Sequence, residues 1–159
     1  MKKANSFLVA SLLLALPASA EIVATDGWVR ATVPGTKVGA GYVTLRNSGS
    51  ETHKLLSLTS PVTDQVTLHM SSVDSNGVAR MWPVASLSLK AGEQVRLEPN
   101  AMHLMFMDLT APFVVGARVP VTFRFEGNET VIVNLEVKPL DYAAKPAAMN
   151  HKSMDPSKH

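Results

Sequence analysis

Short runs in which apolar and polar residues alternate fill the chain from residue 22 to residue 140. Two runs are especially regular, and their apolar positions are Val119, Val121, Phe123 and Phe125, then Val131, Val133, Leu135 and Val137. A period of two indicates a β-strand with one buried face, because successive side chains point to opposite sides of the sheet. No segment sustains the 3.6-residue period of an amphipathic helix. The pattern predicts an all-β fold.

Turn-forming residues separate the runs and divide this region into many short strands. The expected strands cover residues 28–31, 41–46, 53–58, 64–70, 78–82, 86–89, 94–98, 102–107, 118–125 and 130–138. The strongest turn signal is Asp74-Ser75-Asn76-Gly77, because an Asn-Gly pair adopts positive φ angles at low cost. Short strands joined by such turns are typical of an antiparallel β-sandwich or barrel.

The first twenty residues have the pattern of a secretory signal peptide. Lys2 and Lys3 precede an apolar run over residues 7–16, and Ala18-Ser19-Ala20 matches the cleavage pattern of small residues. A membrane anchor is the alternative, but the run is short for ~30 Å of hydrocarbon, and no later stretch reaches the ~18 apolar residues of a spanning helix. We expect cleavage after Ala20 and export to a periplasm, with no membrane span in the mature chain.

The two ends therefore flank one expected domain. A β-sandwich over residues 21–140 follows the signal peptide, and the remaining residues 141–159 contain two prolines and few large apolar side chains. Such a composition predicts a flexible, disordered tail.

Charge and cysteine content narrow the possible functions. The chain has 15 Lys+Arg and 13 Asp+Glu, and loss of Lys2 and Lys3 with the signal peptide would leave 13 of each. A chain without excess positive charge or a basic block offers little to a phosphate backbone, so a nucleic-acid partner is not expected. The absence of cysteine excludes disulfides, thiolate metal sites and cysteine nucleophiles.

Histidine and methionine are the remaining candidates for chemistry. In a strand over residues 102–107, His103, Met105 and Met107 share one face, and Met102, Leu104 and Phe106 share the other. In the strand that ends at residue 70, Thr67 and His69 lie opposite the apolar face of Val66, Leu68 and Met70. Both strands thus present an imidazole on the face away from the expected core.

Two histidines and two methionines would form a site that prefers Cu(I). Thioethers are soft, neutral ligands that select Cu(I) over harder cations, and without cysteine a blue-copper centre cannot form. Imidazole must be neutral to bind a metal, so the affinity should fall as the pH drops through the His pKa. The alternative is that the methionines only fill the core and that the histidines are ordinary surface residues, which is our interpretation of His53.

The spacing of these residues resembles a known family. His69-Met70 is followed after ten residues by Met81, and after a further twenty-one by His103-Leu104-Met105. This is similar to the His/Met signature of periplasmic PCu(A)C-type copper chaperones. The resemblance extends to Trp28-Val29-Arg30 and Gly39-Ala40-Gly41-Tyr42, and so covers most of the mature chain.

The resemblance implies a fold, a function and a ligand set. The fold would be a cupredoxin-like Greek-key β-sandwich or barrel. The protein would bind Cu(I) through His69, Met81, His103 and Met105 and supply it for the dinuclear copper centre of cytochrome c oxidase, on subunit II, beside a Sco-type thiol protein in some members. Met70 matches an optional position of the signature and ranks lower, because the alternation turns it toward the core.

The tail also resembles extensions found in part of that family. Met149, His151, Met154 and His159 could capture a second copper ion, with imidazoles favouring Cu(II) and thioethers Cu(I). An unstructured polar end with incidental His and Met is an equally open interpretation.

Three other functions remain as alternatives to delivery. An enzyme is not expected, because no nucleophile, metalloprotease motif or carboxylate pair stands out. An exported β-sandwich that binds a partner without metal, and a periplasmic copper-storage or copper-resistance protein, are the others.

Overall fold

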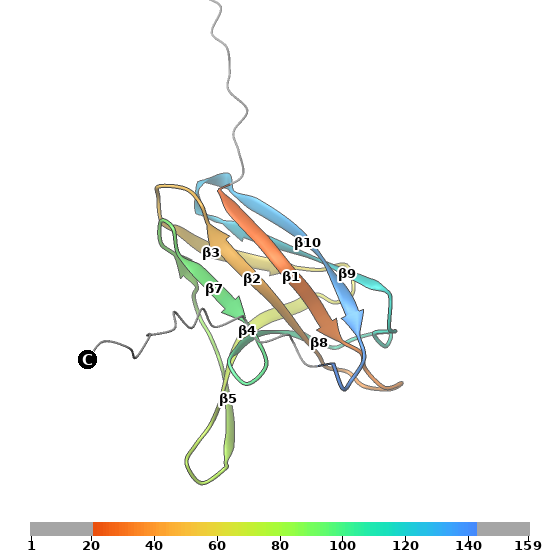
Figure 1. Cartoon of the computed structure of the whole chain (residues 1–159). Coiled ribbons are helices and arrows are strands. Elements are labelled where there is room, and N and C mark those ends of the chain that lie inside the picture. The colour runs from red at the N-terminus through yellow and green to blue at the C-terminus, as the bar shows by residue number, and fades with distance from the viewer. Residues whose placement is uncertain (1–20, 143–159) are drawn as a thin grey trace, which may run out of the picture.

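The structure, a computed structural model, describes residues 21–142 and is built almost entirely of β-strands (Figure 1). The strands are β1 (Ile22–Arg30), β2 (Gly39–Asn47), β3 (His53–Thr59), β4 (Gln65–Val73), β5 (Ala79–Pro83), β6 (Ser88–Leu89), β7 (Gln94–Leu97), β8 (Met102–Met107), β9 (Arg118–Phe125) and β10 (Thr130–Lys138). The single helical element of this region is the 3₁₀ turn η1 (Glu126–Asn128), and no helix here is long and apolar enough to cross a bilayer. The all-β prediction is confirmed.

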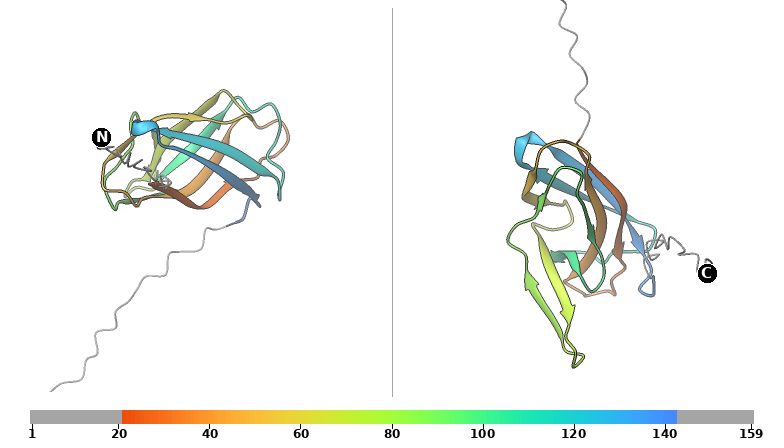
Figure 2. Two further views of the ribbon diagram at one scale, coloured as in Figure 1. Left: turned by 90° about the horizontal axis from the view of Figure 1, so that it is seen from above. Right: turned by 60° about the vertical axis from the view of Figure 1, so that its left-hand side comes forward.

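The strands form one curled sheet that closes partway into a half-barrel. Their order is β5-β4-β8-β2-β1-β10-β9-β3-β6. The remaining strand, β7, pairs with residues 43–46 of β2. The sheet bends so that its two halves face each other across a common core (Figure 2). Neighbouring strands are antiparallel, except that β1 pairs parallel with β10. This arrangement confirms the expected sandwich or barrel.

The core contains the apolar stripes that the alternation predicts. Val119, Val121, Phe123 and Phe125 of β9 are exposed by 3% or less, and Leu135 and Val137 of β10 are fully buried. Val131 and Val133 are half-buried at the other end of β10 and pack against the same core. Removing these side chains from water is the main favourable contribution to folding.

A β-bulge near the start of the chain makes β1 longer than the alternation predicts. The pairing of β1 with β2 shifts by one residue between Thr25 and Trp28, and Asp26 takes a positive φ of 54°. An extra residue in one strand exchanges the two faces beyond it. Before the bulge Ile22 points into the core, whereas after it Val29 does so and Trp28 lies on the opposite face.

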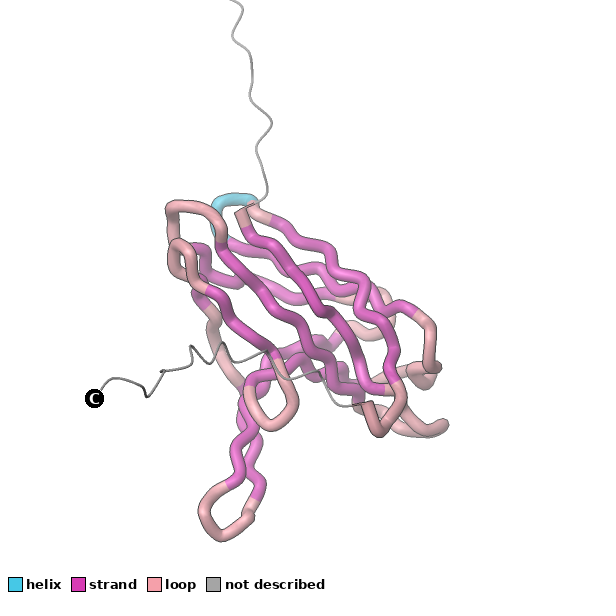
Figure 3. The backbone as a smooth tube through the Cα atoms, in the orientation of Figure 1, coloured by secondary structure: helices cyan, strands magenta, loops and turns pink. Residues whose placement is uncertain are grey.

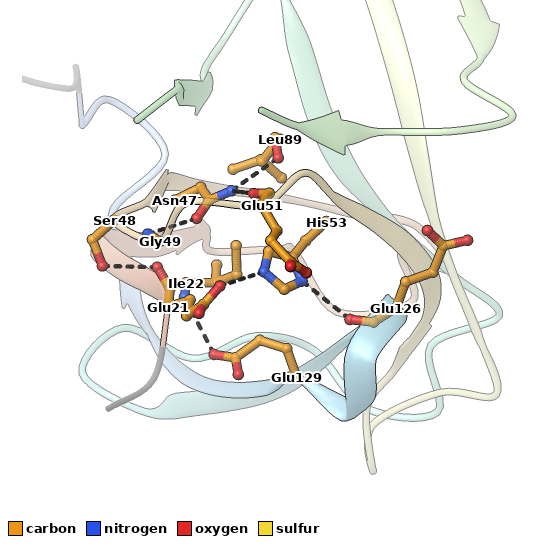
Figure 4. Close-up of polar contacts among 10 residues, drawn as sticks. All are labelled: Glu21, Ile22, Asn47, Ser48, Gly49, Glu51, His53, Leu89, Glu126 and Glu129. Carbon is orange, nitrogen blue, oxygen red and sulfur yellow. Dashed lines mark hydrogen bonds and ion pairs between the residues drawn. The ribbon is translucent and has the colours of Figure 1, made fainter. Parts of the chain in front are cut away.

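Buried polar side chains tie together the end of the half-barrel where β1 begins (Figure 4). Asn47 is fully buried; its Nδ2 donates hydrogen bonds to the carbonyls of Glu51 (2.6 Å) and Leu89 (3.0 Å), and its Oδ1 accepts one from Gly49 N–H (2.9 Å). The side chain thus uses three of its hydrogen-bonding positions and joins the loop after β2 to β6.

His53 is part of the same network, and its interpretation as a surface residue is wrong. It is 8% exposed, its Nε2 lies 2.7 Å from Glu21 Oε2, and its Nδ1 lies 3.1 Å from the Glu126 carbonyl oxygen. These contacts raise the pKa of His53, the hydrogen bond to Glu21 contributing most and the Glu126 carbonyl next. The negative charge of Glu21 offsets the positive charge of His53, which lets the imidazole be buried at the start of β3.

The last described residue, Tyr142, makes an aromatic contact with β1. Its ring packs edge-on against Trp28, with ring centroids 4.9 Å apart. The expected signal peptide over residues 1–20 and the tail residues Met149, His151, Met154 and His159 lie outside the described residues.

Candidate metal centre

The hairpin of β4 and β5 projects from the half-barrel at the end opposite the Asn47 network (Figures 1 and 3). Its turn is the Asp74–Gly77 segment that the sequence predicts. Asp74 Oδ1 accepts hydrogen bonds from the backbone of Asn76 (3.0 Å) and Val78 (2.9 Å), and Gly77 has a φ of 79°. The aspartate therefore holds the turn closed and aligns β5 beside β4.

The strand pairing brings the four candidate ligands to one face. Across β4 and β8, His69 stands opposite His103 and Thr67 opposite Met105; across β4 and β5, Ser71 stands opposite Met81. Paired residues share a face, and so do residues two positions apart along a strand. His69, Met81, His103 and Met105 thus lie on the face that points away from the core.

The two imidazoles are close enough to share one metal ion. The centroids of the His69 and His103 rings are 6.3 Å apart, and the ring planes are inclined by 50°. Two rings whose nitrogens bind one ion at roughly 2.0–2.1 Å have centres separated by roughly 5–6.5 Å. The observed spacing falls within that range.

The backbone orients His103 for binding through one nitrogen. His103 is 4% exposed, and its Nδ1 lies 3.0 Å from the carbonyl oxygen of Ala101. A carbonyl only accepts hydrogen bonds, so Nδ1 is the nitrogen that carries a proton here, and in the neutral ring Nε2 has the free lone pair. Metal-binding histidines in proteins are held in the same way by an acceptor on the other ring nitrogen.

His69 has a nitrogen that the described protein leaves without a partner. Its Nδ1 is buried, and no hydrogen-bonding atom of residues 21–142 reaches it. A buried polar nitrogen without a partner carries a substantial free-energy cost, and a bound ion would remove it. Burial, followed by the charge of His103, lowers the pKa of His69, which keeps the ring neutral and able to bind a metal near pH 7.

The methionines differ in exposure and in direction. Met81 is 54% exposed on the hairpin and Met105 is half-buried, whereas Met102 lies on the other face and packs against the core. Core packing therefore accounts for Met102 and not for Met105. Met70 pairs with Met102 across the strands, on the face opposite His69, so the register gives no support to the lower-ranked ligand role of Met70.

Two aromatic residues beside His103 were not singled out as site residues from the sequence. Tyr42 lies 6.4 Å from His103 between ring centroids, and Trp28 lies 4.3 Å from Tyr42. Both are buried, and burial raises the pKa of Tyr42. The bulge in β1 places Trp28 on this face, so the periodicity alone could not reveal the contact. The only signal in the sequence is that both belong to segments that resemble the copper chaperones.

The donor set on this face is unusual for a hard or borderline metal. Within residues 21–142, no cluster of three or more His, Cys, Asp or Glu side chains is placed to hold an ion. An ion between His69 and His103 would take further protein ligands from the thioethers of the same face, which favours Cu(I) over Zn²⁺, Ca²⁺ or Mg²⁺.

Comparison with known proteins gives a family and a fold. The chain matches the family described as putative lipoprotein LpqE-like over residues 22–137. A putative lipoprotein of Leifsonia xyli subsp. xyli is 32% identical over 132 residues, which cover 77% of this chain and 78% of that protein.

Solved structures of copper-binding domains are similar in fold. The Cu(I) form of DR1885 from Deinococcus radiodurans is 30% identical with a TM-score of 0.57, and the match covers 79% of this chain and 81% of that one. The copper-bound PCuAC domain of PmoF2 has a TM-score of 0.62 at 20% identity, over 75% of this chain and 93% of that domain. These matches show that the chain belongs to the LpqE-like family and has the cupredoxin-like fold of PCuAC domains.

Proposed function

We propose that this protein is a periplasmic copper chaperone that binds Cu(I) through His69, Met81, His103 and Met105. The observation that carries the proposal is the His69–His103 pair, with ring centroids 6.3 Å apart and a buried His69 nitrogen that has no partner within residues 21–142. The copper-bound states of DR1885 and the PmoF2 domain support copper as the cargo. The expected signal peptide and the lipoprotein in the family description support export.

The chemistry of the four side chains suits the transport of Cu(I). All four donors are neutral, so the site holds a monovalent ion without an anionic ligand. Thioethers bind Cu(I) selectively, and each is a single weak ligand that another protein can displace. The exposed Met81 is the ligand that an acceptor reaches first, whereas the buried His103 holds the ion until transfer.

The acceptor that we propose is the dinuclear copper centre of cytochrome c oxidase, on subunit II, reached directly or beside a Sco-type thiol protein. A thiolate-bearing acceptor binds Cu(I) more tightly than thioethers do, so transfer to it is downhill. No step in this transfer requires catalysis by the chaperone.

Anaerobic Cu(I) titration against a competing chelator tests the proposal. Residues 21–159 are compared with a chain that ends at Tyr142, which keeps all ten strands and the Trp28–Tyr142 contact. We expect one tight equivalent in both chains, and its loss in the His103→Ala variant. Absence of tight binding in both chains would refute the chaperone.

The same titration separates delivery from storage and tests the tail. A second, weaker equivalent in the longer chain alone would assign copper binding to Met149, His151, Met154 and His159. Several equivalents in the shorter chain would favour storage or resistance. Delivery is tested by incubating the copper-loaded protein with apo subunit II and then measuring the absorption of the dinuclear centre that forms.

A further inference from the structure

A shallow apolar groove borders Met105 on the face that carries the candidate ligands. We call it the Met105 groove; its volume is about 330 Å³, and its walls include Arg30, Val33, Val38, Ala40, Met105 and Leu140. Val33 is 57% exposed, Val38 38% and Leu140 55%. Adjoining apolar side chains that remain in water on a folded domain mark a surface that binds something.

Among the residues that the structure describes, the wall of the groove includes one cationic side chain and no acidic one. Arg30 is the charged residue of the wall, and the ion pairs formed within residues 21–142 do not include it. Its Nε is buried without an acceptor in the described protein, and its guanidinium lies 5.9 Å from the Trp28 ring centroid. The two Nη atoms of Arg30, unlike Nε, are not buried without a partner, so a carboxylate in the groove can bind the guanidinium through both of these nitrogens.

The position of the groove beside the candidate copper ligands indicates what kind of partner binds there. Copper passes between proteins by exchange of ligands, so a partner must bring a donor atom to bonding distance of the ion. His103 is buried on the inner side of the site, and the thioethers of Met81 and Met105 form its accessible side. A partner that approaches the ion from that side also covers the surface next to Met105.

We propose that the Met105 groove is the docking surface for the protein that exchanges copper with this chain, and that it takes an apolar segment whose carboxylate pairs with Arg30. This inference rests on the proposed function, and it adds the chemistry of the partner. Charge complementarity selects the occupant, because an acidic side chain would satisfy Arg30 while apolar neighbours cover Val33, Val38 and Leu140. An arginine within an apolar patch is typical of the residues that dominate binding at protein interfaces.

Titration of ¹⁵N-labelled apo protein (residues 21–159) with a short peptide tests the surface without copper. The probe is acetyl-Gly-Leu-Glu-Leu-Gly-amide, and its matched control has Gln in place of Glu. We expect saturable shifts of the amide signals of Val33, Val38, Ala40 and Met105. The Gln peptide should bind about fivefold to tenfold more weakly, since it lacks the charge-assisted hydrogen bonds.

Variants of the groove separate charge from packing. Arg30→Gln should remove the preference for the Glu peptide, and Arg30→Lys should restore part of it. Val33→Glu adds a competing carboxylate at an exposed position and should weaken the Glu peptide without disturbing the fold. This second variant keeps the test decisive where loss of Arg30 prevents folding.

Three outcomes would overturn the inference. They are the absence of saturation below about 10 mM peptide, equal binding of the two peptides, and shifts centred on another surface. Shifts of the groove signals on truncation at Tyr142, with no peptide present, would also overturn it, by showing that the chain's own C-terminal residues fill the groove. Retention of one Cu(I) equivalent by Arg30→Gln, in the chelator titration, separates failure of the docking surface from failure of the copper site.

Discussion

The buried imidazole of His53 and the partly exposed carboxylate of Glu21 form an ion pair, with 2.7 Å between Nε2 and Oε2, at the end of the half-barrel where β1 begins (Figure 4). The Glu126 carbonyl occupies the other ring nitrogen at 3.1 Å. The Glu21 carboxylate and the Glu126 carbonyl only accept hydrogen bonds. Both ring nitrogens therefore donate a proton in these contacts, and the folded state favours the imidazolium form of His53.

The pair makes the stability of the fold depend on pH. Because the contacts of His53 raise its pKa above 6.5, its contribution to the free energy of unfolding is complete below about pH 6.5 and is lost as the pH rises through the folded-state pKa. Urea unfolding of wild type should therefore show stability falling as the pH rises above about 6.5. Glu21→Gln should flatten this slope.

Glu51→Gln is the matched control for that measurement, because Glu51 is exposed in the adjacent loop and is not among the groups that raise the pKa of His53. Identical slopes for wild type and Glu21→Gln would contradict the prediction. His69, whose pKa is lowered, changes stability below about pH 6.5 and so acts in a different range.

Replacement of Met105 by leucine should weaken Cu(I) binding more than Cu(II) binding. Leucine keeps the volume of the side chain and removes the soft sulfur ligand, so Cu(I) affinity should fall on the order of tenfold or more. Competition titrations with both ions measure the two losses. Met107→Leu is the control, since Met107 shares the strand and face but stands opposite Gln65, farther from the histidines. Equal losses for both ions would contradict a thioether ligand at Met105.

Gly41 lets β2 approach the core closely, and Gly41→Ala should destabilise the fold. A Cβ at this position would lie 2.9 Å from the Phe106 ring and 3.1 Å from Val29 Cγ1. Both neighbours are fully buried, so neither moves freely, and we expect a loss of about 1–3 kcal/mol in the free energy of unfolding. Chemical denaturation measures it; the exchange Ala40→Ser, on the other face of β2, should cost less than half as much.

Asn47→Ala should be among the most damaging polar substitutions in the domain. The variant removes both donors to the Glu51 and Leu89 carbonyls and the acceptor for Gly49. Leaving a buried carbonyl unpaired costs about 1–3 kcal/mol, so the unfolding midpoint in urea should fall markedly. Asn76→Ala provides the comparison, because Asn76 is exposed in the hairpin turn. Similar losses of stability in the two variants would show that the hydrogen bonds of Asn47 do not stabilise the domain.

The alternation of side chains predicts the strands well and misses the first half of β1. Thr25-Asp26-Gly27 has the composition of a turn, yet here it forms a bulge within a strand. An ideal Cβ at Gly27 would lie 2.7 Å from Leu135 of β10, so packing against another strand decides the conformation. The same reason explains His53, whose burial depends on Glu21 and Glu126 from distant parts of the chain.

The sequence by itself determined which residues share a face within the strands that alternate without a bulge, β4 and β8 among them. That information is local, because the geometry of the extended backbone turns successive side chains to opposite sides. It separated His103 and Met105 from Leu104 and Phe106, and His69 from Leu68, and the spacing of His and Met indicated copper.

Only the tertiary structure decided which strands lie side by side and in what register. The pairing of β4 with β8 sets His69 opposite His103, and the bulge in β1 turns Trp28 toward Tyr42 and Arg30 toward the Met105 groove. These contacts join residues far apart along the chain, and their geometry depends on how the whole sheet curls around its core. No local pattern contains that information, because each strand could pair equally well by its backbone alone.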